Sequence, residues 1–167
     1  MKKVRIILLG LILFTGVNFA QAQKIGHIDY TELVSAMPET KAMKNELTKL
    51  SETYANEFQT QVQALQAKLK KYGEEQATQT QAENEKRQKE VQTEEMRLQQ
   101  ARQTASQELQ KKQMALLEPI QKKAQKAVED VAAEKGILYV LDASPGSSLL
   151  VFKGEDLMGA TKTKLGI

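Results

Sequence analysis

Residues 43 to 72 read MKNELTKLSETYANEFQTQVQALQAKLKKY, and the spacing of their apolar side chains decides the fold class. The steps between successive apolar residues are 4, 3, 4, 4, 4, 3, 4 and 3, a mean of 29/8, or 3.6 residues. This is the period of an α-helix with one buried face. The stripe consists of Met43, Leu47, Leu50, Tyr54, Phe58, Val62, Leu65, Leu69 and Tyr72.

The charge-free run FQTQVQALQA at residues 58–67 alternates locally in the manner of a β-strand. Its apolar members nevertheless continue the helical stripe, and Gln and Ala are good helix formers. We therefore expect one long helix through this run. Its mean step, slightly above 3.5 residues, does not require strong supercoiling.

A second helix is expected after a polar stretch, because residues 73–90 contain no aliphatic side chain larger than Ala. Two helices with one apolar stripe each predict an antiparallel hairpin with its bend near residues 76–85. Residues 58–67 would then lie alongside residues 97–106, and each arm would be ~55 Å long at 1.5 Å per residue. The second stripe consists of Val91, Leu98, Ala105, Leu109, Leu116, Ile120, Ala124, Ala127 and Val131.

Pro119 lies inside the predicted second helix, in the sequence LLEPIQKK. Proline lacks the backbone N–H of a helical residue, so we expect a kink or a local break there. Pro119 is therefore the candidate hinge of the arm.

The two ends of the chain predict a small β-containing head. Residues 24–37 begin with a β-prone segment, and residues 137–141 and 149–152 are short apolar runs separated by the turn sequence DASPGSS. Gly136 is expected to cap the long helix, and a closing helix is expected from Asp156. The predicted fold class is α+β, mainly α, with a head of residues 23–38 and 136–167 and a helical hairpin arm of residues 39–135.

This head is too small to bury a self-sufficient core, and three short strands leave open edges. Without cysteine, disulfides cannot staple it. We therefore expect subunits to pool their strands in a closed, oligomeric β-barrel head from which the arms project. The candidate head residues are Ile25, Ile28, Ile137, Tyr139, Leu141, Leu149 and Val151.

The first 22 residues have the pattern of a secretory signal peptide: three basic residues, an apolar block and the small-residue site Ala20-Gln21-Ala22. A retained anchor helix is the alternative, but the apolar block is shorter than the ~20 residues that a bilayer needs. Removal of residues 1–22 leaves 24 − 3 = 21 basic against 21 acidic residues. The mature chain is then neutral, which disfavours a nucleic-acid partner.

Catalytic and metal sites are not indicated. His27 is the single histidine and there is no cysteine, so neither a zinc set nor a histidine-based triad can be assembled. Asp29 and Asp142 could form a carboxylate pair, but Asp before Ser-Pro-Gly is common turn chemistry. The glycines lack phosphate-loop spacing. Basic residues near the bend are interleaved with glutamates, which favours a solvated tip over an acid-binding surface.

The surface that is most informative about function is an uncharged strip on the predicted helices. Met96, Gln100, Gln103, Gln107, Gln110 and Met114 follow helical spacing on the face opposite the apolar stripe, and Gln59, Gln63 and Gln66 belong to the charge-free run of the first helix. These glutamines are either ordinary helix-compatible surface residues or a surface that holds an extended polypeptide. Met adapts its shape, and amides can bond to exposed backbone, which suits the second interpretation.

With these features, the chain resembles the Skp/OmpH family of periplasmic chaperones over essentially its whole mature length. The resemblance rests on KIGHIDYTELVSAMPE at residues 24–39, on the Lys/Gln-rich hairpin, and above all on GILYVLDASPGSSLLVFKGEDLMGATKTKLGI at residues 136–167. It implies a homotrimer whose shared β-barrel carries three arms around a cavity, and an ATP-independent holdase for unfolded outer-membrane proteins. The basic arm tips described for that family are not matched, because the charges near this bend nearly balance.

The missing catalytic and ligand residues predict a protein that is not an enzyme and has no cofactor or metal. The resemblance implies a periplasmic location, with unfolded outer-membrane proteins and copies of itself as partners. The alternative is a structural spacer or adaptor that bridges components of the cell envelope. Such a spacer would need a further binding domain, and the head offers little room for one.

Overall fold

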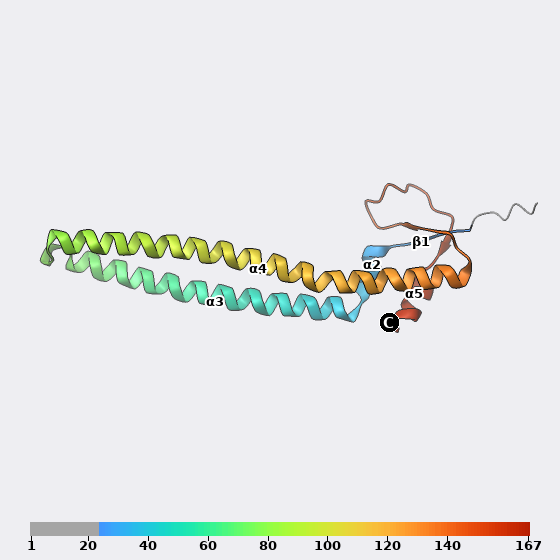
Figure 1. Ribbon diagram of the computed structural model, residues 1–167, viewed down its shortest axis with the longest axis horizontal. Coiled ribbons are helices and arrows are strands. Elements are labelled where there is room, and N and C mark those ends of the chain that lie inside the picture. Colours follow the sequence, from blue (N-terminus) through green and yellow to red (C-terminus); the bar gives the residue numbers. More distant parts are fainter. Residues whose placement is uncertain (1–23) are drawn as a thin grey trace, which may run out of the picture.

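A helical hairpin dominates the structure (Figure 1). The computed structural model describes residues 24–167, so the predicted signal peptide lies outside the described residues. Helix α3 (Pro38–Glu75) leads through the 3-10 turn η1 (Gln76–Thr78) to helix α4 (Gln81–Lys135). Pro38 occupies the first turn of α3, where its missing N–H costs no hydrogen bond, and Thr80 caps α4 by accepting from the Glu83 amide. The hairpin and the predicted bend are confirmed.

The register of the two helices differs from the prediction by about one turn. Phe58 lies against Arg102, and Lys68 contacts Glu90 and Glu94 across the pair. The charge-free run at residues 58–67 therefore lies level with the segment from Glu94 to Arg102, which is shifted towards the bend relative to the predicted residues 97–106. The reason is that the chain turns at residues 76–80, nearer the start of the predicted interval.

The sequence predicted a kink or a local break at Pro119. A break is wrong, because α4 continues through this residue to Lys135, and a kink stays a prediction. A proline removes one hydrogen bond, here to the carbonyl of Ala115 four residues earlier. Ala115 is exposed, so water can reach that carbonyl. Whether Pro119 acts as a hinge remains a prediction.

The head contains a three-stranded parallel sheet with strand order β2-β1-β3. Strands β1 (Ile25–Ile28) and β2 (Tyr139–Asp142) pair over four residues, while β3 (Glu155–Asp156) pairs over two. Helix α2 (Tyr30–Ala36) follows β1, and α5 (Met158–Leu165) follows β3. Among residues 24–167 of one subunit the sheet is open. The predicted closed β-barrel, which pools strands from several subunits, stays a prediction.

One predicted strand is misplaced. Residues 149–152 lie in the loop between β2 and β3 and pair with no strand, whereas Glu155 and Asp156 form the third strand. The β-prone run is displaced because Gly154 approaches β1 more closely than any larger residue could. A Cβ atom at Gly154 would collide with the carbonyl oxygen of Ile25. The expected closing helix is confirmed, beginning at Met158, whose amide donates to Asp156.

The head and the base of the arm share one hydrophobic core, which the sequence-based division into head and arm did not foresee. The last turns of α4 bury small and branched side chains under the sheet, and α2 and α5 close the ends. Small side chains let the helix approach the strands closely. The core consists of Ile28, Leu33, Met37, Met43, Ile120, Ala124, Val128, Val131, Ala132, Ile137 and Leu157.

Helix α4 ends as predicted at Gly136, whose positive φ of 64° suits glycine and whose N–H bonds back to the last turn. Among residues 24–167, no helix combines the length and the apolarity that a membrane span requires.

Candidate functional site

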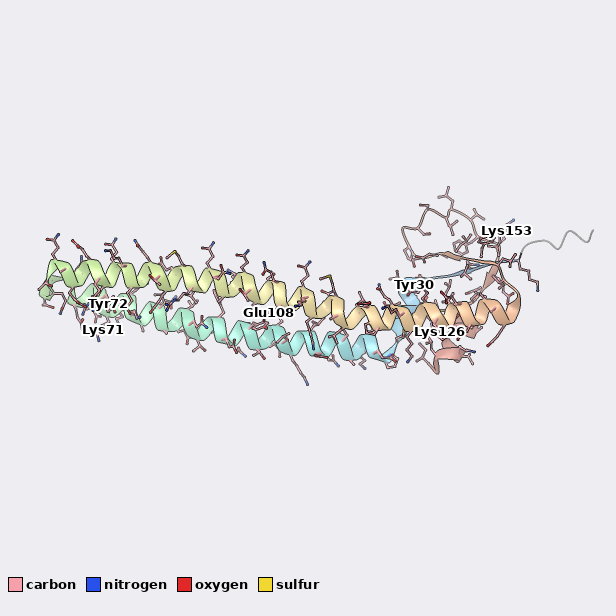
Figure 2. All side chains as sticks on the ribbon, viewed as in Figure 1. Tyr30, Lys71, Tyr72, Glu108, Lys126 and Lys153 are labelled. Carbon is pink, nitrogen blue, oxygen red and sulfur yellow. The ribbon has the colours of Figure 1, made fainter. Side chains whose placement is uncertain are left out.

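The outer side of α4 carries the uncharged strip that the sequence predicts. Met96 and Met114 are 62% and 60% exposed, and the four glutamines between them are exposed as well. The α4 side chains project to solvent along the arm (Figure 2). These long side chains are therefore accessible to another molecule.

Gln59, Gln63 and Gln66 are also exposed, on α3. They lie level with the part of α4 that carries Met96 and Gln100, as the facing pairs Phe58–Arg102 and Lys68–Glu94 require. The two sets form separate strips on two helices, and they overlap in height only near Met96 and Gln100. The structure does not join them into a single pocket within the subunit.

A groove between the helices was missed by the sequence-based reasoning. It encloses about 390 Å³ midway along the arm, where Ala55, Ala101 and Ala105 leave space between the helices. The Arg102 guanidinium lies over the Phe58 ring, 5.4 Å from its centroid. The signal that could have revealed the groove is the concentration of alanines at seam positions, where larger side chains would have filled it.

Tyr54 lines the same groove and donates a hydrogen bond to Glu108 of α4. This contact raises the pKa of the Tyr54 hydroxyl, because loss of its proton would place two negative charges together. The phenol is therefore held as a neutral donor that fastens the two helices.

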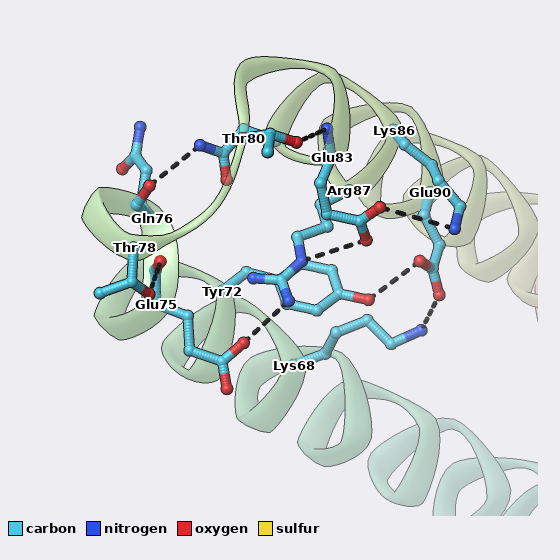
Figure 3. A network of polar contacts seen from close by, with 11 residues as sticks. Lys68, Tyr72, Glu75, Gln76, Thr78, Thr80, Glu83, Lys86, Arg87 and Glu90 are labelled. Atoms are coloured by element: carbon cyan, nitrogen blue, oxygen red, sulfur yellow. Dashed lines mark hydrogen bonds and ion pairs between the residues drawn. The ribbon is translucent and has the colours of Figure 1, made fainter.

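Near the bend, charged residues join the two helices (Figure 3). Lys68 of α3 donates to Glu90 at 2.7 Å and to Glu94, while Tyr72 donates to Glu90 at 2.9 Å. Arg87 of α4 donates to Glu75 at 2.8 Å and lies 4.6 Å from the centre of the Tyr72 ring. The sequence predicts a solvated tip here, and the structure adds that several of its charges pair across the hairpin.

Asp29 and Asp142 are brought together in the head, where the single proton of the Ser144 hydroxyl lies within hydrogen-bond distance of both carboxylates. Asp29 also caps α2 through the Glu32 amide, and Asp142 accepts from the amides of Ser144 and Tyr30. Each carboxylate thus fixes a turn, in agreement with the turn-chemistry interpretation. The Ser144 bonds lower the pKa of Asp142.

His27 lies on the central strand, with its ring centroid 4.6 Å from that of Phe152 in the β2–β3 loop. Its Nδ1 atom is buried without a hydrogen-bond partner. Between residues 24 and 167, no group of three or more His, Cys, Asp or Glu side chains is arranged to hold a metal ion. The observed contact of the His27 side chain is its packing against Phe152.

The candidate head residues divide into two groups. Ile28 and Ile137 are buried in the core of the subunit, and Leu149 is half-buried. The other candidates remain exposed, and the β2–β3 loop adds apolar side chains that the sequence-based choice omitted, with Leu150 97% exposed. The exposed large apolar side chains of the head are Ile25, Leu138, Tyr139, Leu141, Leu150, Val151, Phe152 and Ile167.

Comparison with protein families gives a match over residues 24–165 to the family described as outer membrane protein (OmpH-like). The chain belongs to the OmpH-like family. This match covers the head strands, both arm helices and α5, so the resemblance to the Skp/OmpH family is confirmed.

Among solved structures, this OmpH-like chain is similar to a candidate outer membrane chaperone (OmpH-like) from Caulobacter crescentus. The TM-score is 0.75 at 15% identity, with 86% of this chain and 83% of the other covered. At that identity the similarity shows the OmpH-like fold alone. Comparison with curated proteins gave no match.

Proposed function

We propose that this OmpH-like protein is an ATP-independent holdase chaperone of the periplasm that binds unfolded outer-membrane proteins and prevents their aggregation. The observation that carries the proposal is the long exposed strip of Met and Gln side chains on the arm. Thioethers fit irregular apolar surfaces, and amides satisfy the free N–H and C=O groups of an extended chain. Such contacts are weak and tolerate many sequences.

Assembly through the head is the second part of the proposal. The apolar side chains of the outer sheet face and the β2–β3 loop form an exposed cluster, and strands β2 and β3 have unpaired outer edges. Burial of this cluster between three subunits would set three arms around one cavity. Several weak strips in one assembly then give useful avidity, while each contact can release quickly.

The holdase activity is tested by diluting a urea-unfolded outer-membrane β-barrel protein into buffer with the mature chain and without nucleotide. Light scattering should fall as the chaperone concentration rises. The double variant Met96→Ser and Met114→Ser should need several-fold more protein for equal protection, because it removes the two adaptable side chains at the ends of the strip.

The matched control is Gln99→Ser with Gln113→Ser, two exposed α4 residues outside the strip. It changes the helix to a similar extent and should protect like the unmodified chain. Equal loss in both variants, or no protection by the unmodified chain, would contradict the proposal.

The spacer or adaptor alternative predicts a different outcome in cross-linking. A spacer captures one folded envelope component, whereas a holdase captures many unfolded chains. The exposed strip favours the holdase, because it offers no shaped pocket for one folded partner.

A further inference from the structure

The two halves of the arm are held together by different forces. In the stem, the half next to the head, Met43 and Ile120 are buried, and Leu47 and Leu116 pack against them. Towards the bend, Leu65 is the last buried apolar side chain of α3, and α4 offers no aliphatic side chain larger than Ala before Val91. Hydrophobic burial, which salt and acid do not remove, therefore closes the stem but is weak at the tip.

At the tip, ion pairs and hydrogen bonds between charged side chains connect the two helices. We define the distal clasp as the residues that pair across the hairpin there: Lys68, Tyr72, Glu75, Arg87, Glu90 and Glu94. The side chains of Lys68 and Arg87 are only 27% and 14% exposed, so each is held between the helices. Each cation contacts two acidic groups, since Arg87 also reaches Glu83 at 3.5 Å. The clasp is a network, and networks contribute more than isolated surface pairs.

The network is not fully satisfied. One terminal nitrogen of Arg87, Nη1, is buried without a hydrogen-bond partner. A buried donor without a partner favours any motion that brings water to it. Arg87 therefore both fastens the closed clasp and gains hydration when the clasp opens.

We propose that the distal clasp is a charge-dependent latch that lets the tip of the arm, beyond Leu65, open separately from the apolar part of the arm. Removal of its charges, by mutation or by acid, separates the ends of α3 and α4 while the stem stays closed. The arm then has two parts: a stem held closed by buried apolar side chains, and a tip held closed by ion pairs.

Acid acts on the latch through Glu90. Lys68 and Tyr72 of α3 donate to this carboxylate, and Lys86 of its own helix lies near it. Glu94 shares Lys68 with it, and Arg87 lies over the ring of Tyr72. Hydrogen bonds from Lys68 and Tyr72 lower the pKa of Glu90 below its ordinary value of 4.5. A lowered carboxylate pKa means that its stabilisation is present above the ordinary pKa and is lost as the pH falls through the lowered one. The latch is closed at neutral pH and opens in acid below pH 4.5.

The test measures distances between pairs of spin labels, and the absence of cysteine allows labels at chosen positions. One pair, Lys71→Cys with Lys89→Cys, reports on the tip, and another, Lys49→Cys with Lys111→Cys, reports on the stem. Each pair removes two exposed lysines that lie level on the two helices. Labelled chain is mixed with an excess of unlabelled chain, so that only distances within one subunit are read in any assembly.

The clasp variant is Lys68→Gln with Arg87→Gln. The matched stem variant is Lys112→Gln with Lys123→Gln, which removes the cross-helix pairs with Glu46 and Glu39. In the clasp variant the tip distance should lengthen and broaden while the stem distance stays unchanged. Amide hydrogen exchange at the start of α4 should rise about tenfold or more, as expected for local opening. The stem variant should change neither distance, and acid should reproduce the clasp result in the unmodified chain.

An unchanged tip distance in the clasp variant would overturn the proposal. So would equal opening of tip and stem in either variant, or a tip that stays closed at pH 3. The stem labels also report whether the variant folds, so a general unfolding is distinguished from opening of the latch. No client protein is needed, and the result does not depend on the proposed chaperone function.

Discussion

Gly154 shows how one residue without a side chain determines the position of a strand. It lies directly before β3, so close to β1 that a Cβ atom would meet the carbonyl oxygen of Ile25. Backbone atoms cannot move aside as a flexible side chain can. The close pairing of β1 and β3, and with it the attachment of α5, depends on this glycine.

We expect Gly154→Ala to lower the free energy of unfolding by about 1–3 kcal/mol, the usual cost of overpacking. Thermal or urea unfolding of the mature chain measures the change. The control is Gly159→Ala, because Gly159 lies inside α5 with open space around it. That substitution should stabilise by about 0.5–1 kcal/mol through helix propensity. A neutral Gly154→Ala would show that β3 can shift at no cost.

Asp142 fixes the turn after β2, and its loss should weaken the head. Asp142→Ala removes the acceptor for Ser144 and for the Tyr30 amide, at an expected cost of about 1–2 kcal/mol. Because the Ser144 bonds lower the pKa of Asp142, its contribution is present above the ordinary 3.8 and fades as the pH falls through the lowered value. The difference in Tm between the two proteins should therefore shrink in acid. A difference that is constant down to pH 2 would contradict this assignment.

At the scale of elements, the single helix α4 contributes to three parts of the molecule. Its first turns belong to the clasp, its middle carries the Met and Gln strip, and its last turns form the floor of the head. Pro119 lies between the strip and the head and lines a small groove with Met43 and Leu116. A weak point in α4 at this position would let the strip move relative to the head.

We expect Pro119→Ala to stabilise the protein by about 1–3 kcal/mol, because it restores the hydrogen bond to Ala115 and the propensity of Ala exceeds that of Pro by ~3 kcal/mol. If Pro119 is a hinge, the same variant should also narrow the distribution of distances between labels on the tip and on the head. If the variant is more stable but the distance distribution is unchanged, the effect of Pro119 on helix stability is supported and its role as a hinge is contradicted.

At the scale of the whole molecule, the head presents apolar side chains that a lone subunit leaves in water. Tyr139 and Leu141 lie on the same side of β2, and Val151 extends the apolar surface into the neighbouring loop. Burial of apolar area is the main driving force of association. The open sheet edges add backbone donors and acceptors that another subunit can pair.

We expect the mature chain to be a homo-oligomer, a trimer by its family resemblance, and Tyr139→Ser with Leu141→Ser to lower its native mass towards that of one subunit. Sedimentation at micromolar concentration measures the mass, and far-UV circular dichroism should show that the arm helices remain. The arm variant Met96→Ser with Met114→Ser serves as the control and should keep the native mass. A folded monomer in the unmodified chain would contradict the proposed assembly.

Much of this molecule could be predicted from local pattern. The 3.6-residue spacing from Met43 to Tyr72 determined the first arm, because a continuous apolar stripe has one helical solution and must pack on a second. The polar residues 73–90 located the bend, and Gly136 and Asp156 marked the ends of elements. The exposed Met and Gln strip followed from the same helical period.

Only the tertiary structure decided what depends on contacts between distant residues. The third strand formed at Glu155 and not at the more β-prone residues 149–152, because Gly154 alone permits close approach to Ile25. The core of the head includes alanines and valines from the last turns of α4. The sequence pattern assigned these residues to the arm, because it does not show that the sheet packs against them. The ion pairs of Lys68 and Arg87 with glutamates of the opposite helix depend on the register between α3 and α4. The spacing of apolar residues determines which faces of two helices meet, but it does not determine how far one helix is shifted along the other.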